Sequence, residues 1–477
     1  MVLSRFEDSN SVYRAGMKTA KRKRICYNPP NEREAANPPP FVSVGEFTPT
    51  RAQEIEVEFT MRRLTILFAT IFLVSPLIAG ENWPQFRGQG GNSRADDAKL
   101  PTTWSETKNV VWRTPIHGKG WSSPVVWGDR VWLTTAPEDG KRLFAVCVDR
   151  GNGRVLHDVN VFDVEQPSAL WAKYNSFASP TPAIEEGRVY VHFGTYGTAC
   201  LNSQSGEILW RRRDLHCDHY RGPASSPILY GDLLYLTFDG FDRQYVVALD
   251  KKNGETAWKK DRDIQYKSTN GDMKKAYGTP AIRTIDGKPQ LISSAATATI
   301  AYDPKTGEEL WKVYHGGMNV PAPPLQGQGR IFLCTGDGGL GLLAVREGGR
   351  GDVTATHLDW KAKNRAVVPS RSSPILVDDL LYMVNNDGIV SCLEAKTGDS
   401  VWQERLGGKF WASPLYADGR LYLFDEDGRA HVLAAGRTFK KLAANKLDDG
   451  CRASPAASGN ALFVRTFTHL YRIENKK

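Results

Sequence analysis

Short apolar runs separated by turn-forming residues recur along the chain from residue 109 onward. The clearest repeated unit begins with Ser-Pro or Thr-Pro, continues through a short apolar strand and a Gly- or Asp-containing turn, and ends in a second strand. Runs of this length bounded by turn residues are typical of β-strands. The first copy covers residues 123–132. The prolines that mark the eight copies are Pro124, Pro182, Pro227, Pro280, Pro324, Pro374, Pro414 and Pro455.

The spacing of these prolines predicts the fold. Successive prolines lie 40 to 58 residues apart, which is the length of about four short antiparallel strands and their turns. Repeats of this size are typical of the blades of a β-propeller. We therefore predict an all-β protein, an eight-bladed β-propeller of four-stranded antiparallel blades, over residues 109–477.

A second motif follows the turn in five copies, and it ends in tryptophan in four of them. In its fullest copy, residues 301–311, a strand ends at Asp303, a turn contains Gly307, and the next strand presents Trp311. Glycine tolerates the positive φ of such a turn, and tryptophan offers a large flat surface for packing between blades. We assign a structural docking role to Trp112, Trp210, Trp258, Trp311 and Trp402.

The pattern Ala-x-Asp/Asn-x-x-Thr/Ser/Asn-Gly-x-x-x-Trp resembles the tryptophan-docking motif of the PQQ-type β-propellers. This family includes pyrroloquinoline-quinone (PQQ) dehydrogenases and BamB-like scaffolds, and the resemblance covers residues 109–477. The segment Trp-Pro-Gln-Phe-Arg-Gly at residues 83–88 is similar to the lead-in of secreted bacterial members. Because the motif is structural in every blade, the resemblance implies the fold more than the function.

The last repeat lacks the strand that should complete its blade. It runs through residues 461–464 and 470–473 and has no Gly-x-x-x-Trp strand. The opposite end of the repeats supplies a spare strand at residues 109–113. We predict that this N-terminal strand pairs with residues 470–473 and closes the ring, which would cover the edges of an open array.

The chain before the repeats has a different character. Residues 61–63 are Met-Arg-Arg, residues 64–74 are an apolar run, and small residues follow up to residue 80. This layout is typical of a secretory signal peptide, and the run is shorter than the roughly 20 residues of a membrane span. We predict an export signal at 61–80 and a lead-in segment at 81–108. Residues 1–60 are expected to be disordered or a mis-assigned start.

Charge and cysteine content narrow the functions that the chain can have. The formal charge is +9, but it is spread along the chain, and an exported protein rarely meets nucleic acid. We therefore expect no nucleic-acid partner, and membrane contact only through an uncleaved signal. The 7 Cys are too few for a disulfide scaffold. Cys147, Cys200 and Cys392 occupy an alanine position of the repeat, which favours small buried residues.

The repeat also predicts a ring of residues around the central channel. The innermost strand of each blade lines the channel, so the residue three positions before each marker proline should lie at one mouth. This ring would contain Trp121, Ser179, Ala224, Tyr277, Pro321, Arg371, Trp411 and Arg452. Aromatic and arginine side chains can hold a small anionic ligand by stacking and charge-assisted hydrogen bonds. We select Trp121, Tyr277, Arg371, Trp411 and Arg452 as ligand-binding candidates; the alternative is a solvated rim.

Two histidines complete the set of candidates. His216 and His219 lie in a long loop expected on the same face, and we place them at the channel mouth as well. Their spacing alone is too weak to predict a metal site, and no metal site is predicted. The chain has no Gly-x-Ser-x-Gly, His-Glu-x-x-His or P-loop motif, so no catalytic residue is assigned.

These observations favour an exported, non-catalytic scaffold in the periplasm or outside the cell. Such a scaffold would bind an unidentified protein partner or a small anionic ligand. The alternative is a PQQ- and calcium-dependent dehydrogenase of alcohols or sugars, and the resemblance implies PQQ with calcium as its cofactors. Fewer than 400 residues follow Gly80, and the blades need nearly all of them, which leaves little chain for the insertions of a dehydrogenase.

Overall fold

The fold was analysed in a computed structural model, which describes residues 82–170, 173–339, 341–362 and 368–476. The predicted extension at 1–60 and the predicted export signal at 61–80 lie outside the described residues. Helical structure in the described part is limited to three short 3-10 helices, η1 (Gln89–Gly91), η2 (Gly194–Tyr196) and η3 (Gly271–Lys274). None of the helices described there is long and apolar enough to cross a membrane.

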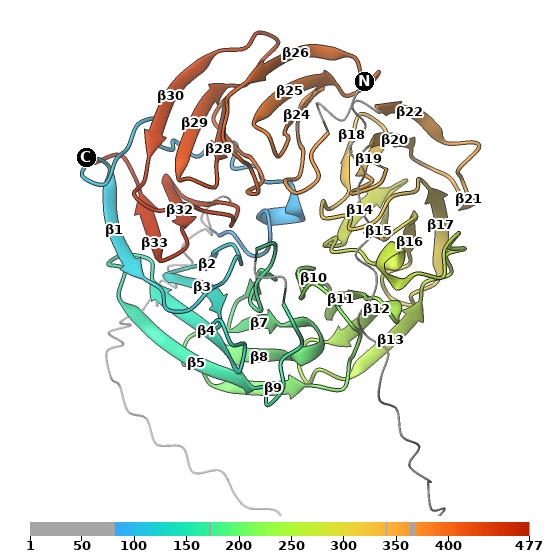
Figure 1. The fold of residues 1–477 in the computed structure, drawn as a ribbon, viewed down its shortest axis with the longest axis horizontal. Coiled ribbons are helices and arrows are strands. Elements are labelled where there is room, and N and C mark those ends of the chain that lie inside the picture. Colours follow the sequence, from blue (N-terminus) through green and yellow to red (C-terminus); the bar gives the residue numbers. More distant parts are fainter. Residues whose placement is uncertain (1–81, 171–172, 340, 363–367, 477) are drawn as a thin grey trace, which may run out of the picture. The chain divides into compact units, whose positions relative to one another are not determined.

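The described residues form eight β-sheets arranged around a central axis (Figure 1), which confirms the predicted eight-bladed propeller. Blade 1 contains β2 (Val125–Trp127), β3 (Arg130–Thr135), β4 (Arg142–Asp149) and β5 (Val155–Asp163). Blade 2 contains β6 (Ala183–Glu185), β7 (Arg188–His192), β8 (Thr198–Asn202) and β9 (Ile208–Arg212). Blade 3 contains β10 (Ile228–Tyr230), β11 (Leu233–Asp239), β12 (Gln244–Asp250) and β13 (Thr256–Asp261).

The next four blades follow the same order along the chain. Blade 4 contains β14 (Ala281–Ile285), β15 (Lys288–Ser294), β16 (Ala298–Tyr302) and β17 (Glu309–Tyr314). Blade 5 contains β18 (Leu325–Gly327), β19 (Arg330–Cys334), β20 (Leu342–Arg346) and β22 (Leu358–Ala362). Blade 6 contains β23 (Ile375–Val377), β24 (Leu380–Val384), β25 (Ile389–Glu394) and β26 (Ser400–Arg405). Blade 7 contains β27 (Leu415–Ala417), β28 (Arg420–Phe424), β29 (Arg429–Ala434) and β30 (Lys441–Lys446).

Blade 8 joins the two ends of the propeller, as the sequence predicts. It contains β31 (Ala456–Ser458), β32 (Ala461–Arg465), β33 (His469–Ile473) and the N-terminal strand β1 (Val110–Pro115). β1 pairs antiparallel with β33, with Trp112 opposite Arg472 and Arg113 opposite Tyr471. In Figure 1, β1 lies beside β33 near the C-terminal end of the chain. The predicted pairing of the N-terminal strand with residues 470–473 is therefore confirmed.

Blade 4 departs from the four-stranded pattern. The chain between β20 and β22 of blade 5 forms a short strand, β21 (Gly351–Asp352), that pairs parallel with β17 through Trp311 and Gly351. This makes blade 4 a five-stranded sheet. The reason is local, because blade 5 carries a longer Gly-rich connection where most other blades have a compact turn, and that connection reaches the edge of blade 4.

Burial follows the position of each strand within its blade. β11, an inner strand, is buried along almost its whole length, whereas β13 at the outer edge buries only Trp258. Inner strands are covered by neighbouring blades on both faces, so their sequences are almost uniformly apolar. The core of the propeller is therefore the set of interfaces between blades, and the outer strands supply single large residues to those interfaces.

Most docking tryptophans cover the glycine turn of the following blade. A Cβ atom placed on Gly153, Gly254 or Gly307 would come within 2.6 to 2.7 Å of the tryptophan ring on the preceding blade. The indole N–H also donates to that turn: the Trp112 N–H bonds to Arg150 O at 3.0 Å and the Trp258 N–H to Pro304 O at 2.9 Å. The N–H groups of Trp210 and Trp402 bond to Lys251 O and Gly436 O, both at 3.0 Å.

Trp311 is placed differently, and Trp360 completes the set. The indole N–H of Trp311 donates to Gln290 Oε1 of its own blade at 2.8 Å, because the following blade has the long connection in place of a compact turn. Trp360, which the sequence analysis did not select, covers Gly398 and donates to Ala395 O at 3.2 Å. Trp360 is not preceded by the Gly-x-x-x pattern of the other docking tryptophans, so the repeat motif did not reveal it.

The lead-in segment crosses the inner ends of several blades. Trp83 pairs with Val126 of blade 1, and Arg94 forms a bridge to Tyr416 of blade 7. Between them, Arg87 is 1% exposed, and its Nη2 donates to Pro374 O at 2.7 Å. Burial, together with the nearby charge of Arg283, lowers the pKa of Arg87 to about 9. The segment therefore joins non-adjacent blades through buried polar contacts.

Candidate functional site

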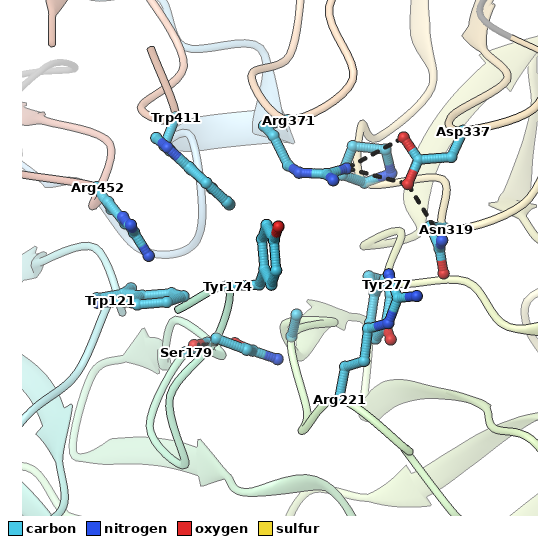
Figure 2. Close-up of a pocket in the computed structure, with 13 residues that line it drawn as sticks. Trp121, Tyr174, Ser179, Arg221, Tyr277, Asn319, Asp337, Arg371, Trp411 and Arg452 are labelled. Atoms are coloured by element: carbon cyan, nitrogen blue, oxygen red, sulfur yellow. Dashed lines mark hydrogen bonds and ion pairs between the residues drawn. The ribbon is translucent and has the colours of Figure 1, made fainter. Parts of the chain in front are cut away.

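One cavity brings together the eight residues predicted to ring the channel mouth. We call it the funnel; its lining includes Trp121, Ser179, Ala224, Tyr277, Pro321, Arg371, Trp411 and Arg452 (Figure 2). Each of these residues lies three positions before the marker proline of its blade. The common register of the repeat places them at equivalent points around the axis.

Five further residues line the funnel, and the sequence analysis did not select them. They are Tyr174, Asn175, Arg221, Asn319 and Asp337. All lie in connections between strands rather than in the repeat motif. Asp337 belongs to an Asp-Gly pair that is typical of a hairpin turn, and Arg221 follows His219 by two residues. The length of these connections was the one available signal, since long loops on one face of a scaffold often carry function.

On one side of the funnel, an arginine lies between two tryptophans. The Arg452 guanidinium carbon is 4.3 Å from the ring centre of Trp411 and 4.5 Å from that of Trp121. Glu426 holds this arginine, accepting from Arg452 Nε at 2.9 Å, and also accepts from Trp411 Nε1 at 3.0 Å. The cation–π and charge-assisted contacts reinforce one another. The group is consequently fixed at the channel wall (Figure 2).

On the opposite side, Asp337 is held by two polar neighbours. Arg371 Nη1 lies 3.3 Å from both carboxylate oxygens, and Asn319 Nδ2 donates to Asp337 Oδ2 at 3.1 Å. Figure 2 shows this chain of contacts, with Tyr277 and Arg221 below it. Burial raises the pKa of Tyr277 above its ordinary value, so its phenol stays protonated at neutral pH. The funnel thus presents neutral donors and cations around one engaged carboxylate.

His216 and His219 lie outside the funnel. The Thr195 backbone N–H donates to His219 Nε2 at 3.1 Å, and His216 Nδ1 lies 3.2 Å from the Thr195 hydroxyl. Both histidines therefore attach their loop to η2 of blade 2, and neither is among the described lining residues of the funnel. Desolvation lowers the pKa of His219 to about 4, which keeps the ring neutral and able to accept this hydrogen bond.

The described lining of the funnel does not fit a calcium-bound quinone. Calcium takes six to eight oxygen ligands, whereas Asp337 is the one carboxylate among the described lining residues and is already bound to Arg371 and Asn319. Arg452 also covers the ring faces of Trp121 and Trp411 on which a flat cofactor would stack. No group of three His, Cys, Asp or Glu side chains arranged for a metal occurs among the described residues.

The fold and the docking motif define a PQQ-repeat β-propeller. A family model described as outer membrane protein assembly factor BamB matches residues 161–283, 242–403 and 356–441, which together span more than half of the chain. The chain therefore belongs to this BamB-like family of PQQ-repeat propellers.

Individual relatives have diverse names. Tetrathionate hydrolase of Acidithiobacillus ferrooxidans is 24% identical over 359 residues, covering 69% of this chain and 68% of the hydrolase. Methanol dehydrogenase [cytochrome c] subunit 1 of Methylobacterium organophilum is 29% identical over 190 residues, covering 35% of this chain but only 29% of that subunit. The crystal structure of BamB from Moraxella catarrhalis superposes with a TM-score of 0.54 at 13% identity, covering 76% of this chain and 99% of BamB. This last likeness concerns the fold alone.

Proposed function

We propose that this chain is an exported PQQ-repeat propeller that acts as a non-catalytic binding scaffold, with the funnel as its ligand site. The family name, an assembly factor for outer membrane proteins, supports a protein partner outside the cytoplasm. The signal-like pattern at residues 61–80 supports export.

The observation that carries this proposal is that Asp337, the one carboxylate among the described lining residues, and Glu426, which contacts Arg452 and Trp411 of that lining, both already accept hydrogen bonds. Asp337 is bound by Arg371 and Asn319, and Glu426 is bound by Arg452 and Trp411. A general base must be within reach of a substrate proton and able to accept it. Carboxylate oxygens that already accept hydrogen bonds from arginine, asparagine or indole N–H groups have fewer lone pairs left to take up a substrate proton. The funnel is therefore better suited to hold an anion than to remove a proton from an alcohol.

The alternative is a PQQ- and calcium-dependent dehydrogenase of alcohols or sugars. The similarity to methanol dehydrogenase favours it. Dehydrogenation through a quinone requires the cofactor to be held against the substrate, with a base for the hydroxyl proton. In this chain Arg452 and Tyr174 lie where a stacked cofactor would need open tryptophan faces. That geometry is the reason why we favour the scaffold.

One assay separates the two functions. The purified protein is titrated with PQQ and calcium while tryptophan fluorescence is followed, and reduction of an electron-accepting dye is then measured with alcohols and aldoses. We expect no dye reduction above the protein-free rate, with or without the cofactors. Turnover that depends on PQQ would contradict the scaffold proposal. A quinoprotein dehydrogenase assayed in parallel verifies that the cofactor is active.

Export is tested separately. Residues 61–80 are fused to an alkaline phosphatase that is active only after export, and the fusion is compared with one in which Leu67 and Phe68 are changed to Arg. We expect activity from the first fusion and none from the second, because charges in the apolar run block recognition of a signal peptide. Equal activity of the two fusions would contradict export through this segment.

A further inference from the structure

We propose that a second cavity, at the opposite end of the inner strands from the funnel, binds the oxyanion group of a small organic molecule. Its position follows from the course of β18, which begins shortly after Pro321 of the funnel lining and ends at Gly327 of the second cavity. Asn92 and Arg94 of the lead-in segment form one wall, so we call it the lead-in cavity. No described lining residue belongs to both cavities, and the proposal therefore goes beyond the function proposed for the funnel.

Two buried arginines at this cavity have no carboxylate partner among the described residues. Arg283 of β14 lines the cavity, is 8% exposed, and donates from Nε and Nη2 to Pro324 O at 3.1 and 2.6 Å. Arg87 is 1% exposed, and its Nη2 donates to Pro374 O at 2.7 Å and to Asn92 O at 3.4 Å. Both side chains remain protonated at neutral pH, although burial lowers the pKa of Arg283 to about 10. Backbone carbonyls thus solvate two positive charges here without neutralising them.

Electrostatics favours an external anion beside this pair. A buried charge without an opposite charge is costly, and the charge of Arg283 contributes to the lowered pKa of Arg87, which shows that the two repel each other. Arg262 is buried as deeply, but Asp239 accepts from its Nε at 2.5 Å. Arg465 is buried without a carboxylate too, but burial is the one cause of its lowered pKa, and it is not among the described lining residues of either cavity. Arg87 and Arg283 therefore differ from both in lying together at an open cavity.

Arg94 and Asn92 supply the contacts that a ligand can reach. The Arg94 side chain is 24% exposed; its Nε and Nη2 pair with Asp96, and its Nη1 donates to Leu376 O at 3.2 Å. Two of its five N–H groups are left for a ligand. Asp96 is 54% exposed, so water and ions screen its charge. The exposed Asn92 side chain adds amide donors to the same wall, since its Oδ1 accepts from the Arg94 backbone N–H. Guanidinium and amide donors side by side suit the several oxygens of a phosphate or carboxylate group.

The size of the lead-in cavity indicates that the oxyanion belongs to an organic molecule. The volume is about 410 Å³, well above the roughly 150 Å³ of a cavity that holds benzene, so a bare phosphate would fill only part of it. Leu325 and Leu376 provide apolar wall for the remainder of the ligand. Asp378 is the one carboxylate among the described lining residues, and its side chain is exposed. Its screened charge should weaken the binding of an anion without preventing it.

Calorimetric titration of the purified protein with three sugars that differ at one carbon tests the ligand class. D-glucose 6-phosphate carries a phosphate at C6, D-glucuronate carries a carboxylate there, and D-glucose carries a neutral hydroxyl. We expect saturable binding of at least one anion, with a Kd roughly tenfold or more below that of glucose, because charge-assisted hydrogen bonds are lost with the neutral sugar. The anion that binds more tightly identifies the oxyanion as phosphate or carboxylate. Equal binding of all three sugars, or no saturable binding of either anion, would overturn the proposal.

A variant that should gain affinity locates the binding in the lead-in cavity. Asp378→Asn removes the lining carboxylate, and asparagine tolerates the backbone φ of +53° at this position. We expect the tighter-binding anion to bind roughly two- to fivefold more tightly at low ionic strength, with an unchanged Tm. The control is Asp232→Asn, which changes an exposed acid in the corresponding turn of blade 3, outside the described lining, and it should leave the affinity unchanged. Equal affinity of the parent and Asp378→Asn would overturn the proposal.

Two further variants should lose affinity for the same anion. Arg94→Gln removes the reachable guanidinium, and we expect binding roughly tenfold or more weaker. Because Arg94 also holds the lead-in segment against Leu376, Gln328→Glu is tested beside it, since it adds a negative charge at an exposed position of the lining and keeps the size of the side chain. We expect binding roughly threefold weaker in Gln328→Glu with the parental Tm. Parental affinity in a folded Gln328→Glu variant would overturn the proposal, whatever the stability of Arg94→Gln.

Discussion

The backbone N–H of Ser123 donates to the hydroxyl of Thr181 at 2.9 Å and so joins the start of blade 1 to the start of blade 2. The same bond recurs around the channel between the residues that precede the marker prolines. The further pairs are Thr181 with Ser226, Ser226 with Thr279, Ser373 with Ser413, and Ser413 with Ser454, at 2.9 to 3.0 Å. The hydroxyl of the Ser-Pro or Thr-Pro pair is therefore an acceptor for the preceding blade.

Replacing Thr181 with valine tests the strength of this inter-blade bond. Valine has nearly the same shape but leaves the buried Ser123 N–H without its acceptor, so we expect the free energy of unfolding to fall by about 1–3 kcal/mol. Urea denaturation measures the change. Thr284→Val is the control, because the Thr284 side chain is exposed, and its effect should stay within about 0.5 kcal/mol. Equal losses of unfolding free energy in the two variants would show that the Ser123–Thr181 hydrogen bond does not stabilise the fold.

Tryptophan docking is tested by two glycines with the same backbone conformation. Gly153 has φ +78° and Gly187 has φ +76°, but a Cβ on Gly153 would lie 2.7 Å from Trp112, whereas one on Gly187 would meet nothing within 4 Å. Gly187→Ala should cost about 1–2 kcal/mol from backbone strain alone. Gly153→Ala should cost about 1–3 kcal/mol more, because the indole must move. Thermal denaturation compares the two, and equal losses would argue against a packing role for Trp112.

The repeat explains how much of the propeller could be predicted from the sequence. A residue at a fixed distance from the marker proline lies at the same place in every blade. The positions of Trp121 and Arg452 could therefore be predicted by counting three residues back from that proline. The spare strand was predictable for a similar reason, since the last repeat lacks one strand and the segment around Trp112 has no blade of its own. The period of the repeat thus predicts the position of every residue that belongs to the repeat.

The remaining features depend on connections that have no period. Asn319 and Asp337 reach the funnel through loops of individual length, and an Asp-Gly pair such as that at Asp337 is typical of any hairpin. His219 was placed at the mouth because its loop is long, but the loop turns back and bonds to Thr195. Trp311 ends a full copy of the motif, but its indole N–H does not bond to a turn of the following blade. That blade has β21 in place of a compact turn.

Acid should destabilise the fold through its buried histidines. His192 is 1% exposed, and burial lowers its pKa from 6.5 to about 3, so the folded state keeps it neutral while the unfolded chain takes up a proton below about pH 6.5. The contribution of neutral His192 to the free energy of unfolding is fully present above pH 6.5. It is lost as the pH falls from there toward 3, at up to about 1.4 kcal/mol per pH unit.

The measurement is urea denaturation between pH 7.5 and 4.5, in the parent and in His192→Gln. The variant should show a flatter dependence of the free energy of unfolding on pH, whatever its stability at pH 7.5. The control is Thr284→Val, which changes an exposed side chain that does not titrate, and it should keep the slope of the parent. A His192→Gln variant with the parental slope would contradict the assignment.

The ion pair of Glu426 and Arg452 should contribute more to stability than an exposed pair. Its two side chains are 22% and 12% exposed, and Glu426 also accepts from Trp411 Nε1 at 3.0 Å. Glu426→Gln keeps an oxygen for the indole but removes the charge opposite Arg452, so we expect the free energy of unfolding, measured by urea denaturation, to fall by about 1–3 kcal/mol.

The control is Glu394→Gln, which breaks a pair whose Arg437 is 55% exposed, and should cost less than about 1 kcal/mol. Added salt should reduce the effect of the control more than that of Glu426→Gln, because water and ions screen exposed charges more strongly. Equal losses with the same salt dependence would show that the pair beside the tryptophans behaves as a surface pair.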